Sequence, residues 1–170
     1  ADLSFVDGTD DVVLDDTYKE YIFKFIDLHP ATNDIHFSVN FSIDSGSNYN
    51  VTKTSSYFRT RHKEDDATAE VGYSTGFDIA QGTGEATIFD SVANDNDGSW
   101  CGELHLFNPS SDTFVKHFLS RCQGMSASPL SNDVYSAGYG NTTSAIDAVR
   151  FQMSSGNIDA GDICLYGISS

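Results

Sequence analysis

The sequence predicts an all-β protein, folded as an antiparallel two-sheet β-sandwich of the jelly-roll type with about eight main strands. Of the 25 acidic residues in this 170-residue chain, 20 are Asp and 5 are Glu. Asp favours turns and disfavours helix interiors, where Glu is well accepted. Short runs of aromatic and β-branched residues recur between clusters rich in Gly, Ser, Asn and Asp, which is typical of strands joined by turns.

The strongest strand signals lie in the first third of the chain. Residues 21–26 (YIFKFI) are apolar on nearly both faces, which indicates a central strand. Residues 35–43 alternate strictly between apolar and polar side chains, so one face of this strand should point into a core. After a turn at 45–48, residues 49–61 are expected to form the next strand.

The remaining chain predicts further strands of the same sandwich. Residues 62–66 are a charged loop, and 75–82 suit a loop or a single helical turn. A Pro/Ser/Asp turn at 108–112 separates two β-type runs and predicts a hairpin. A jelly roll is the expected arrangement because so many strands must double up to protect their edges. The later strands are expected at 86–91, 100–107, 113–122, 134–139, 146–153 and 163–168.

The domain organisation is expected to be an acidic segment followed by one β-sandwich domain. Residues 1–17 carry six Asp and no basic residue, and predict an N-terminal arm or edge strands; residues 18–170 predict the jelly-roll domain. Carboxylates repel one another, so this segment would not pack readily on an equally acidic domain. We therefore expect it to serve assembly more than folding. Its candidate partner-binding residues are apolar: Leu3, Phe5, Val12, Val13 and Leu14.

The net charge of −16 argues against several classes of partner. A nucleic-acid binder needs a basic surface that meets phosphates, and anionic membranes likewise attract basic segments. No apolar run approaches the roughly 20 residues that span a bilayer. We therefore expect neither nucleic acid nor a membrane as a partner.

No motif predicts catalysis, a cofactor or a metal. Residues 72–76 match G-x-S-x-G, but that nucleophile elbow needs a strand-to-helix turn on a parallel sheet. His105 and His117 lie on the two arms of the predicted hairpin and could face each other near a metal, although ordinary sheet-surface positions explain them as well. Residues 94–98 (NDNDG) offer oxygen ligands but lack the distant Glu of a calcium loop.

Two further residue classes are open to more than one interpretation. Cys101, Cys122 and Cys164 have no C-x-x-C spacing and an odd count, so we expect three free, mostly buried thiols. Several aromatic residues could stack on sugars, although most suit the core or rim of a sandwich. They are Tyr49, Tyr57, Tyr73, Trp100, Tyr135 and Tyr139.

Several longer strings resemble a known protein family. They are YIFKFIDLHPAT at 21–32, DSGSNYNVT at 44–52, GELHLFNPSS at 102–111, AGYGNTTSAID at 137–147, and MSSGNIDAG at 153–161 followed by LYGI at 165–168. These strings resemble a small family of virion structural proteins, of the capsid decoration (knob) or tail-fibre-like kind, from marine tailed bacteriophages, especially cyanophages. The resemblance covers 18–168 and departs most at 59–72. The family has no known catalytic residues, so none is carried over.

The resemblance implies a non-enzymatic protein of the virion surface, assembled in the host cytoplasm. The expected function is a capsid decoration or knob protein on the head, where an acidic surface keeps many copies soluble and apart. The alternative is a tail or fibre component that binds host-surface carbohydrate. Expected partners are other virion proteins (the major capsid protein or tail proteins), further copies of the chain in a homo-oligomer, and under the alternative a host-surface glycan.

Overall fold

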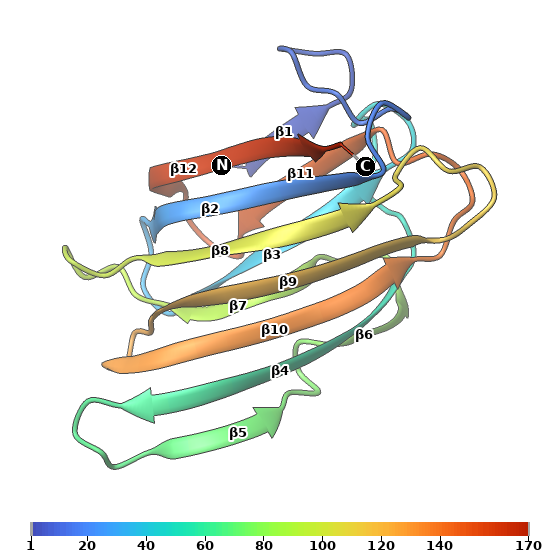
Figure 1. The fold of residues 1–170 in the computed structure, drawn as a ribbon. Coiled ribbons are helices and arrows are strands. Elements are labelled where there is room, and N and C mark those ends of the chain that lie inside the picture. The colour runs from blue at the N-terminus through green and yellow to red at the C-terminus, as the bar shows by residue number, and fades with distance from the viewer. Residues whose placement is uncertain (1, 170) are drawn as a thin grey trace.

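The structure, a computed structural model, describes residues 2–169 and confirms the all-β class (Figure 1). Within these residues no helix occurs that could cross a membrane. The strands are β1 (Asp2–Val6), β2 (Glu20–Pro30), β3 (Ile35–Ser42), β4 (Lys53–Lys63), β5 (Ala69–Tyr73), β6 (Ile79–Gly82), β7 (Ala86–Val92), β8 (Trp100–Phe107), β9 (Lys116–Met125), β10 (Leu130–Gly140), β11 (Ala148–Met153) and β12 (Ile158–Ile168).

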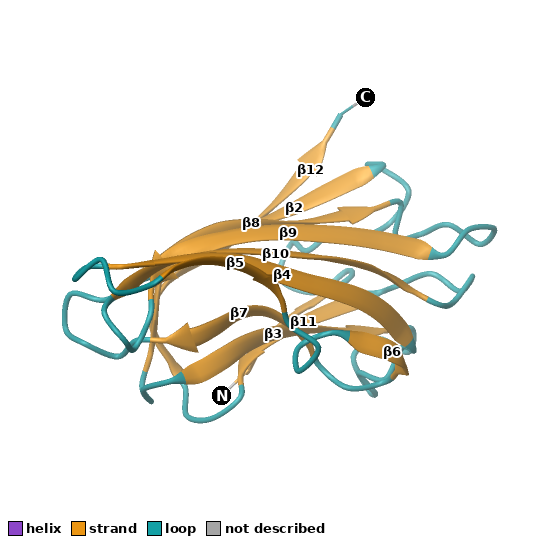
Figure 2. Ribbon diagram, turned by 90° about the horizontal axis from the view of Figure 1, so that it is seen from below, coloured by secondary structure: helices purple, strands orange, loops and turns teal. Residues whose placement is uncertain are grey.

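These strands form two antiparallel sheets. The short sheet has the order β1-β11-β3-β7, and the long sheet has the order β12-β2-β8-β9-β10-β4-β5, with β6 also paired to β4. Figure 2 shows the long sheet arching over the short one. The predicted antiparallel sandwich is therefore confirmed, whereas the jelly-roll connectivity stays a prediction.

An aromatic cluster fills the space between the sheets. The rings of Phe25 and Phe151 lie 5.2 Å apart in an edge-to-face arrangement, and Phe37 stacks on Phe151 at 5.7 Å. Trp100 lies 4.7 Å from the Phe37 ring. Edge-to-face and offset pairs of this kind add to the stabilisation that burial of the rings already gives. Strands β2, β3, β8 and β11 are thus joined through one core.

The alternation in β3 is confirmed on its core face but not on its other face. Phe37, Val39 and Phe41 are fully buried, as the period-2 pattern predicts. The polar side chains between them face the other way, as the pattern predicts, yet Asn40 on this outer face is only 1% exposed. Asn40 contacts Thr83 in the loop before β7, so this loop covers the outer face of β3.

The described residues contain twelve strands, so short strands add to the about eight main strands that the sequence predicts. The additional strands are short and lie at sheet edges or beside β4. All five residues of β5 are exposed, so it has no buried face to leave a periodic signal. Residues 79–82 form β6 and not the loop or helical turn that the sequence suggested.

The N-terminal segment belongs to the sandwich. β1 pairs with β11 at the edge of the short sheet, as the edge-strand alternative for residues 1–17 predicted. Phe5 packs edge-to-face on Phe23, with ring centroids 5.2 Å apart, and Leu14 lies within the core. Both side chains therefore contribute to folding, contrary to the expectation that this segment serves mainly assembly.

Candidate functional site

The five candidate partner-binding residues divide into two groups. Leu3 and Val13 are 42% and 37% exposed, so their side chains can contact another molecule. Leu14 is buried, while Phe5 and Val12 are half-buried and pack against the core. The structure thus leaves two of the five candidates substantially exposed and uses the other three in packing.

Carboxylates lie close to Val13, whereas Leu3 lines a separate pocket with Leu28 and Ile163. The Leu14 amide donates a hydrogen bond of 2.8 Å to Asp7, which folds the segment back on itself. One shallow pocket of about 330 Å³ is lined by Asp7, Asp15, Asp16 and Asp147, among other residues. A second pocket, of about 380 Å³, is lined by Asp10, Asp11, Val12, Val13 and Tyr18, among others. We call Leu3, Val13 and the Asp residues of these two pockets the acidic corner.

A second surface feature is a row of aromatic side chains on the long sheet. Strand register pairs Arg121 of β9 with Tyr135 of β10, Tyr135 with Phe58 of β4, and Phe58 with Tyr73 of β5. The rings of Phe58 and Tyr135 are parallel and 4.8 Å apart. The Arg121 guanidinium lies 5.0 Å from the centre of the Tyr135 ring, within the range of a cation–π contact. We call these four residues the aromatic row.

Ion pairs on the same sheet occupy its basic side chains. Arg121 donates to Asp133 through Nε at 3.2 Å and through Nη2 at 2.9 Å. Lys24 Nζ lies 2.5 Å from the Glu103 carboxylate. The hydrogen bonds from Lys24 and then from His105 lower the pKa of the Glu103 carboxyl. These cations are therefore matched to carboxylates of the chain itself.

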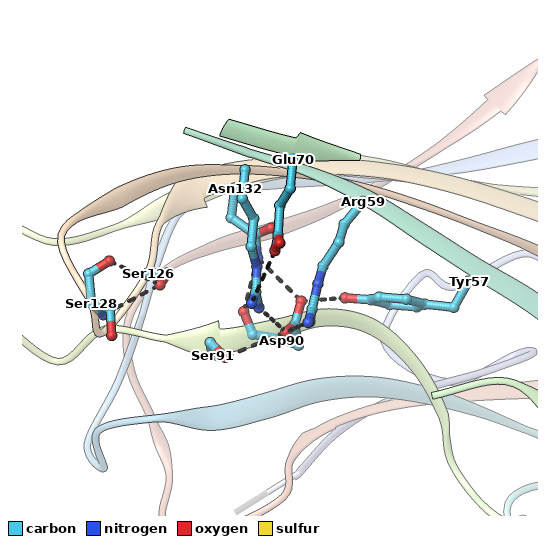
Figure 3. Close-up of polar contacts among 9 residues, drawn as sticks. Tyr57, Arg59, Glu70, Asp90, Ser91, Ser126, Ser128 and Asn132 are labelled. Carbon is cyan, nitrogen blue, oxygen red and sulfur yellow. Dashed lines mark hydrogen bonds and ion pairs between the residues drawn. The ribbon is translucent and has the colours of Figure 1, made fainter. Parts of the chain in front are cut away.

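A buried polar cluster centred on Asp90 joins the two sheets (Figure 3). Asp90, in β7, accepts hydrogen bonds from the Tyr57 hydroxyl at 2.5 Å and from Asn132 Nδ2 at 3.1 Å. Its other oxygen accepts from Arg59 and, at 2.7 Å, from Arg61. Burial, followed by the neighbouring Asp90 charge, raises the pKa of Tyr57, so its hydroxyl stays protonated and donates. Through these contacts Asp90 links β7 of the short sheet to β4 and β10 of the long sheet; we call this cluster the inter-sheet clamp.

The histidines do not meet as the predicted hairpin register suggested. His105 lies opposite Leu119, and its ring contacts Glu20 at 2.5 Å. His117 lies beside the Tyr139 ring on the next strand pair. Within residues 2–169 no group of three or more His, Cys, Asp or Glu side chains is placed to hold a metal.

The cysteines are free, as predicted, but are not mostly buried. Cys122 is buried, Cys164 is half-buried and Cys101 is exposed. Burial raises the pKa of the Cys122 thiol, which makes it unreactive at neutral pH. The Asp27 amide donates to Cys101 Sγ at 3.3 Å.

The sequence identified some of the surface aromatics but not their arrangement. Tyr73 and Tyr135 were among the candidates for sugar stacking, and both lie in the aromatic row. Tyr57 and Trp100 were candidates too, but they are buried. Phe58 was missed, although it is two positions along the same strand from Ser56 and Thr60 and therefore shares their outward face.

No protein-family model matches the chain, and neither a curated protein nor a solved structure matches it.

Proposed function

We propose that the chain is a capsid decoration, or knob, protein: a non-enzymatic structural protein displayed on the head of a tailed bacteriophage particle. The resemblance of residues 18–168 to virion structural proteins of marine phages supports this proposal. The structural observation that carries it is the distribution of charge over the sandwich, which suits a protein displayed in many copies.

Basic side chains do little to offset the acidic exterior. Of the nine Lys and Arg residues, six form ion pairs within the chain, and Lys53 and Lys116 are buried. Most exposed Asp side chains therefore face solvent uncompensated. Copies with such exteriors repel one another, which keeps a densely displayed protein soluble and prevents aggregation.

The acidic corner is the proposed attachment surface for the shell. Leu3 and Val13 would bury apolar area against the major capsid protein and supply affinity. The Asp residues of the acidic corner would pair with Lys or Arg of that less acidic partner and fix the orientation. Of the five predicted partner-binding residues, the proposal thus keeps Leu3 and Val13, whose side chains are exposed.

A homo-oligomer is part of the same proposal. β12 lies at the edge of the long sheet and runs for 11 residues. An edge strand of this length offers backbone N–H and C=O groups that can pair with a strand of another copy. Sedimentation of the purified chain tests this part: a species heavier than the 18.5 kDa monomer supports it, and a monomer at all concentrations contradicts it.

Attachment to particles tests the proposed surface. Particles that lack the protein are mixed with the purified chain, sedimented and analysed for bound protein. The wild type should bind at high occupancy, and the double variant Leu3→Ser, Val13→Ser should not. Val71→Ser, which alters a 74% exposed residue of β5 at the opposite edge of the long sheet, should bind like the wild type. Full binding of the double variant would remove the acidic corner from the proposal.

The aromatic row supports one alternative, a tail or fibre component that binds host-surface carbohydrate. Phe58 and Tyr73 are 43% and 56% exposed, and flat rings of this kind offer apolar faces beside polar groups. Retention of the chain on immobilised host-surface glycans, lost in Tyr135→Ala and kept in the control Leu119→Ala, would favour this alternative. Absence of retention in the wild type would contradict it.

A further inference from the structure

An amine, a carboxamide and a carboxylate meet in a site shielded from solvent at the outer face of β3, beside the loop that precedes β7. Lys53, the first residue of β4, and Asn40 of β3 are 0% and 1% exposed. Lys53 Nζ lies 2.5 Å from Asn40 Oδ1. Asn40 Nδ2 donates at 3.2 Å to Oε1 of Glu85, which immediately precedes β7.

We propose that Lys53 and Asn40 form an intramolecular isopeptide bond, Nζ to Cγ, and that Glu85 transfers the proton for this self-catalysed reaction. The proposal rests on the geometry of these three side chains and not on the proposed virion role. Besides Asn40, Lys53 Nζ contacts the backbone carbonyl of Val51 at 2.8 Å, so the Asn40 carboxamide is the reactive side-chain group in contact with the amine.

The reaction is balanced without any further reagent. Glu85 takes a proton from the Lys53 ammonium, and the neutral amine attacks Asn40 Cγ to give a tetrahedral intermediate. Glu85 then returns the proton to Nδ2, the C–N bond of the carboxamide breaks, and ammonia leaves. The Nζ–Cγ bond forms, and the products are a secondary amide and one ammonia, which takes up the remaining proton of the ammonium.

The surroundings favour each part of this reaction. Burial lowers the pKa of Lys53 to about 8, so the neutral amine is accessible near neutral pH. The Phe41 amide donates to Asn40 Oδ1 at 2.9 Å and can stabilise the oxygen when it becomes negative. Holding the reacting groups in contact removes the entropic cost of bringing them together.

Glu85 is positioned to move the proton. Arg150 Nη2 lies 2.6 Å from its Oε1 and fixes the carboxylate beside Asn40. Its second oxygen, Oε2, is buried and has no hydrogen-bond partner among residues 2–169. A buried acceptor of this kind is costly unless something occupies it, and protonation of Glu85 during the reaction would satisfy it.

Lys116 supplies a matched comparison. It is also fully buried, and burial also lowers its pKa. Its Nζ contacts the backbone carbonyls of Phe114 at 2.8 Å and Thr142 at 3.3 Å. Backbone carbonyls of this kind hold an ammonium but offer no leaving group comparable to ammonia, so Lys116 should stay unmodified.

The intact mass of the purified chain tests the proposal. After incubation at mildly alkaline pH the wild type should be lighter than its sequence by one ammonia. Lys53→Arg and Glu85→Gln should have their full sequence masses, whereas Lys116→Arg should still lose ammonia. Full mass in the wild type would overturn the proposal. Loss of ammonia in Lys53→Arg would overturn it too, since a succinimide at any Asn gives the same loss without Lys53.

A digest of the wild type keeps the test independent of whether the variants fold. Chymotrypsin cleaves after Phe41 and Tyr49, which lie between the two joined residues. With the bond in place, the fragments that contain Asn40 and Lys53 stay covalently linked after reduction and denaturation; separate fragments would overturn the proposal. If linked fragments also form in Glu85→Gln, the bond stands and the proton-transfer role of Glu85 is removed.

Discussion

The Tyr57 hydroxyl of the long sheet donates a hydrogen bond of 2.5 Å to the Asp90 carboxylate of the short sheet, and both residues are fully buried. Two arginines of the same strand as Tyr57 also contact Asp90. A buried carboxylate destabilises the folded state unless hydrogen-bond donors and positive charges compensate it, as they do here. The contact therefore fixes how β7 sits against β4.

Replacing Asp90 should be strongly destabilising. In Asp90→Ala the half-buried guanidinium groups of Arg59 and Arg61 lose their carboxylate, and breaking a buried pair from one side costs about 3–5 kcal/mol of unfolding free energy. Urea unfolding measures this change. The control Asp133→Ala removes the partner of the 61% exposed Arg121 side chain, and should cost less than about 1 kcal/mol. Equal losses in the two variants would contradict the assigned clamp.

The aromatic core gives a second prediction. Phe37 is fully buried against Phe25, Trp100 and Phe151, so Phe37→Ala should lower the unfolding free energy by about 3–5 kcal/mol. Leu119→Ala, at a 42% exposed position on the outer face of the long sheet, should stay within about 0.5 kcal/mol of the wild type. A mild effect of Phe37→Ala in denaturant titrations would show that this core is assigned incorrectly.

Truncation should unfold or weaken the domain. Deletion of residues 1–16 removes β1, the Phe5 ring that packs on Phe23, and the buried Leu14. We expect a loss of about 3 kcal/mol or more, because two core side chains are removed together. Thermal unfolding followed by circular dichroism measures it. A truncated chain that melts within a few degrees of the full chain would instead support the detached arm that the sequence first suggested.

One histidine should make stability depend on pH. A hydrogen bond to Asp159, 2.7 Å from Nδ1, raises the pKa of His29 above its ordinary value of 6.5. The folded state holds this proton more tightly than the unfolded state does. The protonated His29–Asp159 pair therefore adds its full share to the free energy of unfolding below pH 6.5, and this stabilisation is lost as pH rises through the raised pKa. Both side chains are partly exposed, so the stabilisation by this pair should stay below about 1 kcal/mol.

The comparison with Asp159→Asn isolates this effect. The wild type should be more stable than the variant at about pH 5.5, and this advantage should shrink by about pH 8.5. Asp10→Asn, a change of one exposed carboxylate in the acidic corner, serves as the control and should show no such trend. A difference between wild type and Asp159→Asn that does not change with pH would contradict the His29–Asp159 linkage.

Parts of the fold could be predicted because their patterns are local. The period-2 stripe of β3 and the apolar run of β2 identify their strands directly. The β8–β9 hairpin was predicted too, but its register was not. β9 begins at Lys116 instead of Thr113, because the loop before it is extended by turns in which Ser111 accepts from the Phe114 amide. That shift places His105 opposite Leu119.

The buried polar groups could not be predicted, since their partners are distant in sequence. Asp90 is one of 20 Asp residues, and its donors come from β4 and β10. A signal did exist: Asp90 directly follows the apolar pair Ile88 and Phe89 in β7, which is a costly position for an unpaired carboxylate. The contact of Lys53 with Asn40 leaves no such local trace, because it joins strands of different sheets.

The copy number of the chain in purified phage particles tests the central proposal most directly. Quantitative mass spectrometry against the major capsid protein gives this number, and electron microscopy of particles with and without the chain gives its location. A decoration protein should be present in hundreds of copies distributed over the head. A handful of copies confined to the tail, or absence from the particles, would contradict the proposed function.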